Sequence, residues 1–279
     1  MSDIAIYWFR DDLRLNDLTG LSAAAERGPV VALYIWDEKV SEEWRIGSAS
    51  RWWLHKSLAA LEAALTEQGI PLTLRSGNTA TVLEEVCRSV NAKAVYCSRQ
   101  YQPWAGQLEQ SLRDSLSQHD VELKRYPGTL LHEPEAVATG AGTPFKVFTP
   151  FWRACLRRPD PQMPLATPTL SPCPTPVQSE TLKSWNLLPT QPNWAHGWED
   201  LWCPGEDGAH AALEQFLAHH VIDYGDGRDI PSARSTSRLS PYLRFGNLSP
   251  RQVWHEAQAS KVFEPEASSA TDKFLSEIG

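Results

Sequence analysis

The stretch that decides the fold is a short apolar run near the N-terminus, Ile4-Ala5-Ile6-Tyr7-Trp8-Phe9. It does not alternate between apolar and polar residues, which is typical of a strand buried on both faces of a parallel sheet. Residues 30–36 form a second run of this kind, and weaker strand patterns follow at residues 72–74, 94–97 and 121–126. The sequence therefore predicts five short strands before residue 130.

Helical patterns lie between the predicted strands. Leucine or valine recurs at steps of three and four residues in residues 54–65, 82–90 and 108–116, which places these side chains on one helix face. Thr79 stands where it would cap the helix over residues 82–90. The alternation of strands and helices predicts an α/β domain over residues 1–130, with a doubly wound, Rossmann-like, five-stranded parallel sheet.

A charged loop, Arg10–Asp17, follows the first predicted strand. In doubly wound sheets, ligands bind at the carboxyl ends of the strands, near the point where the strand order reverses. The loop lacks a GxGxxG pattern, so the sequence argues against a dinucleotide-dependent dehydrogenase. Two interpretations of the loop stay open, a solvated connection and part of a ligand site.

The composition argues against several classes of protein. Hydrophobic residues make up 42% and charged residues 22% of the 279 residues, which are values of a globular chain. No apolar run approaches the ~20 residues that span a bilayer, and the start of the chain does not resemble a signal peptide. We therefore expect a cytoplasmic protein without membrane contact. The five cysteines include no CxxC pair, so neither a disulfide framework nor a metal site is expected.

Prolines are concentrated in residues 157–192, and proline suits extended backbone. We therefore predict a long connector over residues 131–204, with its tryptophans pinning it against a domain. These are Trp185, Trp194, Trp198 and Trp202. The chain has 12 tryptophans in all. Two roles stay open for them: packing in the core and at interfaces, or stacking on bases and taking part in redox reactions.

The pattern after the connector is helical, and we predict the beginning of an all-α domain over residues 205–279. One amphipathic helix runs to about His220, and Ser249-Pro250 begins another, with a serine cap and a proline in the first turn. A further helix begins near Asp272. No strand pattern occurs in this part of the sequence.

A basic stretch at residues 228–251 stands out from the net charge of −8. It holds five arginines and one aspartate, a local charge of +4, around Ser235-Thr236-Ser237-Arg238-Leu239-Ser240-Pro241. Clustered hydroxyls and guanidinium groups suit phosphate oxygens, because both donate hydrogen bonds. The residue types alone also fit a solvated turn with helix caps.

Three segments resemble the DNA photolyase/cryptochrome family. The string from Tyr224 through Thr236–Pro241 to Ser249 is similar to its flavin-binding signature. Trp8–Asp17 resembles its first strand and loop, and Lys146–Phe151 resembles the entry into its connector. The segments occur in family order, and their details are most similar to bacterial cyclobutane pyrimidine dimer photolyases.

The resemblance implies an α/β antenna domain, a connector and a helical domain that holds FAD, in agreement with the pattern above. It also implies light-driven repair of UV-damaged DNA, in which reduced FAD passes an electron to a cyclobutane pyrimidine dimer flipped from the duplex. The alternative is a cryptochrome, a flavin photoreceptor without repair activity. A nucleotide-binding domain of the electron-transfer-flavoprotein kind would not account for the helical segment.

The resemblance assigns roles to nine residues. The implied FAD contacts are Tyr224, beside the flavin phosphates, and Thr236, Ser237, Arg238, Leu239 and Ser240. Arg228 is implied to contact DNA phosphate, Glu277 to hydrogen-bond the dimer bases, and Phe274 to line the substrate pocket. Alternatives are core aromatics for Tyr224 and Phe274, a surface ion pair for Arg228 and an exposed helix position for Glu277.

The antenna chromophore of the resembled family is a deazaflavin or a folate, and the sequence leaves the choice open. Folate-binding members carry an Asn-Glu pair in the loop after the fourth strand, where this chain has Trp104-Ala105. Arg51 and Trp52 would either line a chromophore pocket or pack on the helix surface.

The helical pattern stops at Gly279, whereas the resemblance implies a helical domain that continues further. We therefore expect an incomplete flavin domain, which on its own binds FAD weakly and does not repair DNA, because half a cavity leaves most of the ligand in water. The complete protein is expected to be a monomer.

Overall fold

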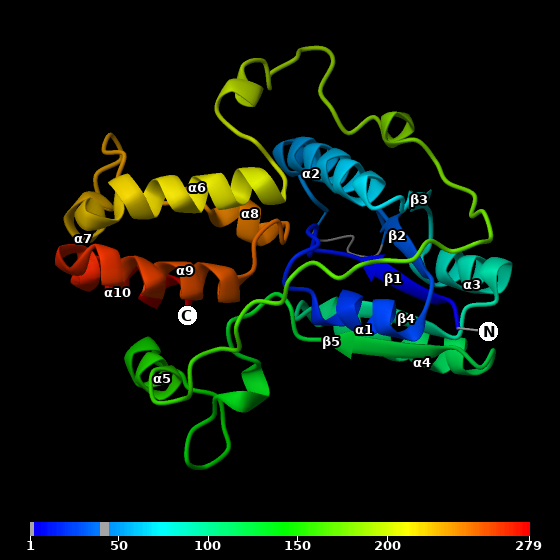
Figure 1. Ribbon diagram of the computed structural model, residues 1–279, viewed down its shortest axis with the longest axis horizontal. Helices are drawn as coiled ribbons and strands as arrows, with labels where there is room; N and C mark the ends of the chain where they lie inside the picture. The colour runs from blue at the N-terminus through cyan, green and yellow to red at the C-terminus, as the bar shows by residue number, and fades with distance from the viewer. Residues whose placement is uncertain (1–2, 40–44) are drawn as a thin grey trace.

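The computed structural model describes residues 3–39 and 45–279 (Figure 1). Its α/β part is built on a five-stranded sheet in which all neighbouring strands are parallel, in the order β3-β2-β1-β4-β5. The strands are β1 Ala5–Phe9, β2 Val30–Trp36, β3 Leu72–Ser76, β4 Ala94–Ser98 and β5 Glu122–Tyr126. The predicted fold class is confirmed, and the strand order reverses between β1 and β4.

Helices cover both faces of the sheet. They are α1 Thr19–Arg27, α2 Ser48–Glu67, α3 Thr79–Val90 and α4 Pro103–Ser117. One buried cluster joins α1 and α2 to the sheet, and a second joins α3 and α4 to it. The sequence predicted α2, α3 and α4, whereas it missed α1, whose small residues carry only a short apolar stripe.

The predicted cap of α3 is wrong by one residue. Asn78 is the cap, and its side-chain oxygen accepts a hydrogen bond of 3.1 Å from the backbone N–H of Thr81. Thr79 is the first helical residue, and its hydroxyl donates to Asp37 at the end of β2.

The connector follows the sheet and is held by backbone and aromatic contacts. The Val30 N–H donates to the Ser171 carbonyl at 2.8 Å, and the Glu180 N–H donates to the Leu74 carbonyl at 2.7 Å. Within it lie the short helix α5 (Phe148–Cys155) and three single 3-10 turns. The sequence missed α5, in which proline occupies the first turn.

The connector tryptophans pack as predicted. Trp185 lies 6.3 Å from Trp36 between ring centroids, while Trp198 and Trp202 each lie 5.3 Å from a tryptophan of α2. Those partners are Trp52 and Trp53, respectively. Trp194 packs on Trp198.

The last part of the chain is helical, and residues 205–279 contain no strand. Its helices are α6 Glu206–His219, α7 Tyr224–Gly227, α8 Ser240–Arg244, α9 Pro250–Phe263 and α10 Ser268–Ile278. In Figure 1, α6 lies alongside α9 and α10. Ser249 caps α9 in a reciprocal capping box with Gln252, as its sequence predicted. None of the described helices is long and apolar enough to cross a membrane.

The charged loop after β1 is not a solvated connection, which corrects one of the two interpretations above. Asp12, Arg14 and Asp17 are buried, with Arg14 only 1% exposed. The Arg14 guanidinium donates to four carbonyl oxygens, including those of Gly128 (2.8 Å) and Gly246 (3.0 Å). The loop is therefore enclosed between the α/β part and the helical part.

Residues 246–251 of the helical part complete this contact. Arg251 forms a two-pronged ion pair with Asp17, with N–O distances of 2.5 and 3.1 Å. The buried Asn247 side chain accepts from the Trp53 indole N–H and donates to the Leu13 carbonyl. Gly246 has φ +63°, and a Cβ there would lie 2.2 Å from the Asp11 carbonyl oxygen. Only glycine fits this approach.

We expect Asp17→Asn to lower the free energy of unfolding by about 3 kcal/mol, because it leaves the largely buried Arg251 without a counter-ion. Urea denaturation of the two proteins measures the difference. The matched control is Lys261→Gln, which removes an exposed ion pair with Asp272 and should cost under about 0.5 kcal/mol. Equal effects of the two substitutions would contradict a structural role for the buried pair.

Candidate functional site

The largest cavity described lies in the helical part, between the end of the connector, one face of α6 and the loop before α8. It is an open groove with a volume of about 870 Å³. The connector contributes residues 199–203, α6 contributes small residues such as Gly208 and Ala212, and the loop contributes residues 231–238. Small side chains on α6 leave the space that the groove occupies.

The loop before α8 carries the hydroxyl and guanidinium groups of the basic stretch. Thr236, Ser237 and Arg238 line the groove together with Arg234. The loop is seated on α7, because the absent side chain of Gly227 leaves room for Ser235: a Cβ there would lie 2.1 Å from the serine hydroxyl.

Arg238 adopts an uncommon backbone conformation with φ +56°. Its guanidinium lies 4.0 Å from the ring centroid of Trp202, a cation–π contact. Among the described residues, neither Arg234 nor Arg238 forms an ion pair with a carboxylate. Acidic side chains, including Asp200 and Asp207, line the groove from the connector and the start of α6. The loop side can therefore bind an anion.

Three of the six predicted cofactor contacts do not line this groove. Tyr224 is buried between Phe216 and Phe274, at 5.7 and 5.5 Å, and burial raises the pKa of its hydroxyl. Leu239 is buried, and Ser240 is exposed at the first turn of α8. The predicted roles of these residues remain predictions.

Arg228 and Glu277, predicted from different segments, lie side by side. Their ion pair has an N–O distance of 2.5 Å, and Lys273 lies 3.4 Å from the same carboxylate. The hydrogen bond from Arg228 lowers the pKa of Glu277. The Arg228 guanidinium also lies 5.5 Å from the Tyr224 ring centroid. Phe274 is buried beneath this cluster, as a core aromatic would be.

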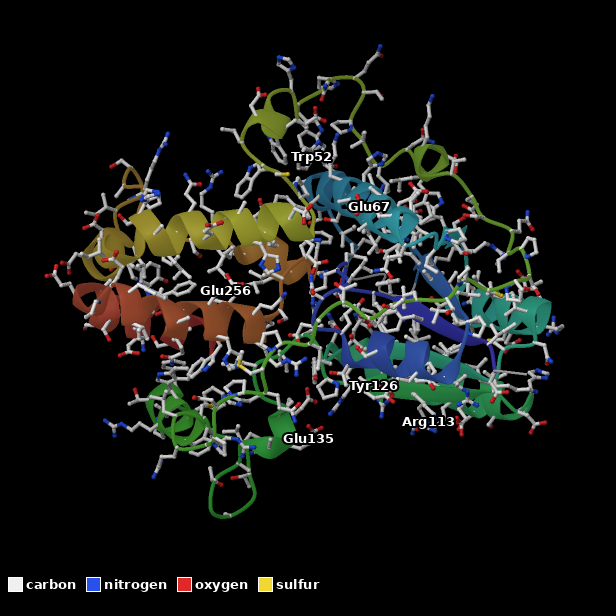
Figure 2. All side chains as sticks on the ribbon, in the orientation of Figure 1. Trp52, Glu67, Arg113, Tyr126, Glu135 and Glu256 are labelled. Atoms are coloured by element: carbon white, nitrogen blue, oxygen red, sulfur yellow. The ribbon has the colours of Figure 1, made fainter. Side chains whose placement is uncertain are left out.

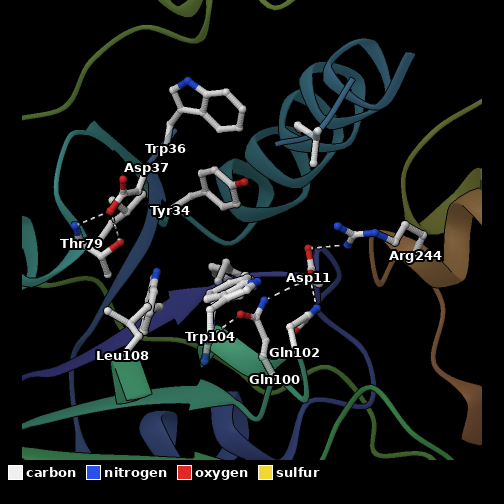
Figure 3. A pocket seen from close by; sticks show the side chains of 15 residues that line it. Asp11, Tyr34, Trp36, Asp37, Thr79, Gln100, Gln102, Trp104, Leu108 and Arg244 are labelled. Carbon is white, nitrogen blue, oxygen red and sulfur yellow. Dashed lines mark hydrogen bonds and ion pairs between the residues drawn. The ribbon is translucent and has the colours of Figure 1, made fainter. Parts of the chain in front are cut away.

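A second pocket of about 420 Å³ lies at the carboxyl ends of β1, β2 and β4 (Figure 3). Trp36 and Trp104 supply aromatic surface. Asp11 accepts hydrogen bonds from Gln100 (3.0 Å) and Gln102 (3.5 Å). Arg244 of α8 reaches the same carboxylate across the domain boundary, at 2.8 Å.

Pattern reasoning indicated this edge of the sheet and the loop that holds Asp11, but it gave no role to Gln100, Gln102 or Arg244, which carry no local motif. Of the candidates that it named, Arg51 lies 5.8 Å from the Trp36 ring, outside the pocket lining. Trp52 is buried in helix packing (Figure 2), which supports the second of its two interpretations. Trp104 lines the pocket from α4 rather than from a loop, and Ala105 is buried in that helix.

Comparison with known proteins agrees with this architecture. The DNA photolyase family model matches residues 5–172, more than half of the chain. The chain belongs to the DNA photolyase family. The family predicted from the sequence is thereby confirmed.

The relatives of this chain include photo-lyases and cryptochromes. The deoxyribodipyrimidine photo-lyase of Agrobacterium fabrum is 38% identical over 98% of this chain and 56% of its own length. Cryptochrome-1 of Arabidopsis thaliana is 32% identical over 92% of this chain and 38% of its own. The crystal structure of a bacterial class III photolyase from Agrobacterium tumefaciens superposes with a TM-score of 0.93 and 37% identity, covering all of this chain and 57% of that one. The chain thus spans about half the length of these photolyases.

We expect ADP, a probe that carries a diphosphate, to bind the groove. Arg238→Gln should weaken its binding about tenfold or more, since a charge-assisted hydrogen bond contributes about 1.5–3 kcal/mol. Isothermal titration calorimetry measures the affinity, which should also fall as salt rises. Arg75→Gln, in an exposed ion pair on the α/β part, is the matched control. If Arg238→Gln bound ADP with unchanged affinity, the phosphates of ADP would not contact Arg238.

Arg228→Gln should raise the pKa of Glu277 toward its ordinary value, because the hydrogen bond that lowers it is lost. A carboxyl group whose pKa is lowered by folding stabilises the folded state at pH values above its ordinary pKa of 4.5. This stabilisation is lost as the pH falls through the pKa of the folded state. Solvent screening keeps the contribution of this exposed pair to stability small. NMR titration of the side-chain carboxyl measures the shift, and Lys273→Gln should produce a smaller one. Equal shifts would show that Arg228 is not the main partner.

Proposed function

We propose that this chain supplies the antenna domain and the phosphate-binding part of the flavin domain of an enzyme for light-driven repair of cyclobutane pyrimidine dimers in DNA. The observation that carries the proposal is the loop of residues 234–238, whose hydroxyl and unpaired guanidinium groups face a groove of about 870 Å³. These donors fit the diphosphate of FAD. When bound, reduced FAD supplies the electron that splits the dimer.

The residues of the groove would bind and orient the cofactor. Thr236 and Ser237 donate from their hydroxyls, and Arg238 adds a charged donor whose direction is set by Trp202. Tyr224, which the resemblance places beside the phosphates, would support the loop from the packed cluster beneath α6. Leu239 and Ser240 would hold the loop at the start of α8.

Arg228, Glu277 and Phe274 would form the DNA side of the site. Arg228 would bind a DNA phosphate after exchanging its carboxylate partner for a phosphate oxygen. Glu277 would then be free to accept hydrogen bonds from the bases of the flipped dimer, against the aromatic support of Phe274. The ion pair holds both side chains in place before DNA binds.

The pocket at the carboxyl ends of β1, β2 and β4 would hold the antenna chromophore. Its aromatic lining and its amide groups suit a planar heterocycle with polar edges, which both a deazaflavin and a folate provide. Neither of the two is favoured by the lining residues.

A cryptochrome-type photoreceptor is the second candidate function. The similarity to Arabidopsis cryptochrome-1, at 32% identity over 92% of this chain, favours it. Both functions use the same flavin groove, so only an assay with damaged DNA separates them.

The test is a fusion of residues 1–279 to the part of the Agrobacterium fabrum photolyase that lies beyond the aligned region. We expect the purified fusion to retain FAD, measured by its absorbance, and to remove dimers from UV-irradiated DNA under blue light but not in the dark. Arg238→Gln should lower the FAD content, and Arg75→Gln should not. Retention of FAD without light-dependent repair would reject the repair function in favour of the photoreceptor.

The 279-residue chain alone should bind FAD weakly and leave dimers intact, because the open groove would leave much of the cofactor in water. Gel filtration followed by absorbance gives the FAD content. Stoichiometric FAD in this protein would contradict the expectation.

A further inference from the structure

A histidine joins two helices beside the boundary between the two parts of the chain. His210 lies in the second turn of α6 and faces α9. Its ring nitrogen Nδ1 lies 3.3 Å from a carboxylate oxygen of Glu256, and Nε2 lies 3.2 Å from the side-chain nitrogen of Gln252. Both partners lie on one face of α9, because they are four residues apart. The imidazole ring therefore bridges α6 and α9.

The two partners select one neutral form of the ring. A carboxylate only accepts hydrogen bonds, so Nδ1 carries the proton and donates it to Glu256. The side-chain nitrogen of Gln252 only donates, so Nε2 accepts a hydrogen bond from it. In this form, both nitrogens of the neutral His210 ring have a suitable hydrogen-bond partner.

Gln252 cannot turn its amide group without losing a hydrogen bond elsewhere. Its oxygen accepts from the backbone N–H of Ser249 at 2.8 Å, which is one half of the capping box that begins α9. Ser249 is only 1% exposed, so water would not replace that acceptor. The Ser249 hydroxyl in turn donates to Asp17, the counter-ion of Arg251. The side chain of Gln252 therefore connects His210 to the buried charges at the boundary.

Protonation of His210 is incompatible with this set of hydrogen bonds. Both nitrogens of an imidazolium are donors, so Nε2–H would meet the donor nitrogen of Gln252 at short range. The charged groups that face the ring are Glu256 on α9 and Glu206 and Asp207 on α6. The hydrogen bond with Glu256 has the largest effect, and the three acids raise the pKa of His210 above its ordinary value of 6.5, although burial lowers it. The conflict with Gln252 is therefore already present in mildly acidic solution.

We propose that His210 is a pH-sensitive switch of the α9 cap. The neutral ring accepts a hydrogen bond from Gln252 and leaves the capping box closed. When the ring takes up a proton from water, the Gln252 amide turns, its oxygen accepts from Nε2–H, and the Ser249 N–H loses its acceptor. Acid thus strengthens the ion pair between α6 and α9 and loosens the first turn of α9, where the helical part contacts the α/β part. The switch is independent of the proposed function, because neither a cofactor nor DNA takes part.

The test follows the Ser249 amide of the intact 279-residue chain by NMR as the pH is lowered through the titration of His210. We expect the hydrogen-exchange protection of this amide, corrected for the intrinsic effect of pH, to fall about tenfold, the factor that corresponds to one lost hydrogen bond. Its midpoint should coincide with that of the His210 ring. The Thr81 amide, which donates to the non-titrating Asn78 side chain at the start of α3, is the internal control and should not respond.

Two variants connect the response to the histidine. His210→Gln removes the titrating group and should make the Ser249 protection independent of pH. Glu256→Gln removes the carboxylate, so the pKa of His210 should fall and the Ser249 midpoint should move to lower pH by the same amount. His196→Gln, at an exposed position of the connector, is the matched control and should keep the response of the starting protein. If circular dichroism shows that His210→Gln is unfolded, the joint shift of the two midpoints in Glu256→Gln decides the question.

Two results would overturn the proposal. One is a Ser249 amide whose protection stays constant while His210 titrates, which would confine the histidine to packing between α6 and α9. The other is a pH response that persists in His210→Gln, or that does not follow the pKa of His210 in Glu256→Gln. Either form of the second result would assign the pH response to another group.

Discussion

The burial of the charged loop after β1 is the constraint on which the arrangement of the two folded parts depends. Charges removed from water must be paired or hydrogen-bonded, since an unpaired buried charge costs several kcal/mol. Asp17 finds its counter-ion in Arg251, and Arg14 finds four carbonyl oxygens from both sides of the boundary. The α/β part and the helical part therefore satisfy each other's polar groups, and α8 is held between them.

The position of α8 links the two cavities. At one end, its Arg244 reaches Asp11 in the pocket at the strand ends. At the other end, the loop of residues 234–238 runs into it through Ser240, and Tyr242 lines the groove. One five-residue helix thus contributes a side chain to each of the two cavities.

Sequence reasoning succeeded where the signal is local. Runs such as Val30–Trp36 are apolar on both faces and allow only a buried strand, and Ser249-Pro250 carries its own capping chemistry. The hydroxyl and guanidinium groups before α8 were recognisable from composition and motif, and four of them line the groove. At Arg10–Asp17 the reasoning could not choose between its two interpretations, because composition does not reveal whether a charge meets water or a partner more than 200 residues away, as Asp17 meets Arg251.

Local pattern was thus sufficient for the α/β class and for the helical character of residues 205–279, and it identified the hydroxyl and guanidinium groups of the loop before α8. Periodicity, capping and residue chemistry act over a few residues, and the sequence displays them directly. Tertiary structure alone decided that the β1 loop is buried, that Arg244 completes a pocket on the α/β part and which tryptophans the connector packs against. These features depend on contacts between distant segments, which form only when the hydrophobic core brings the segments together.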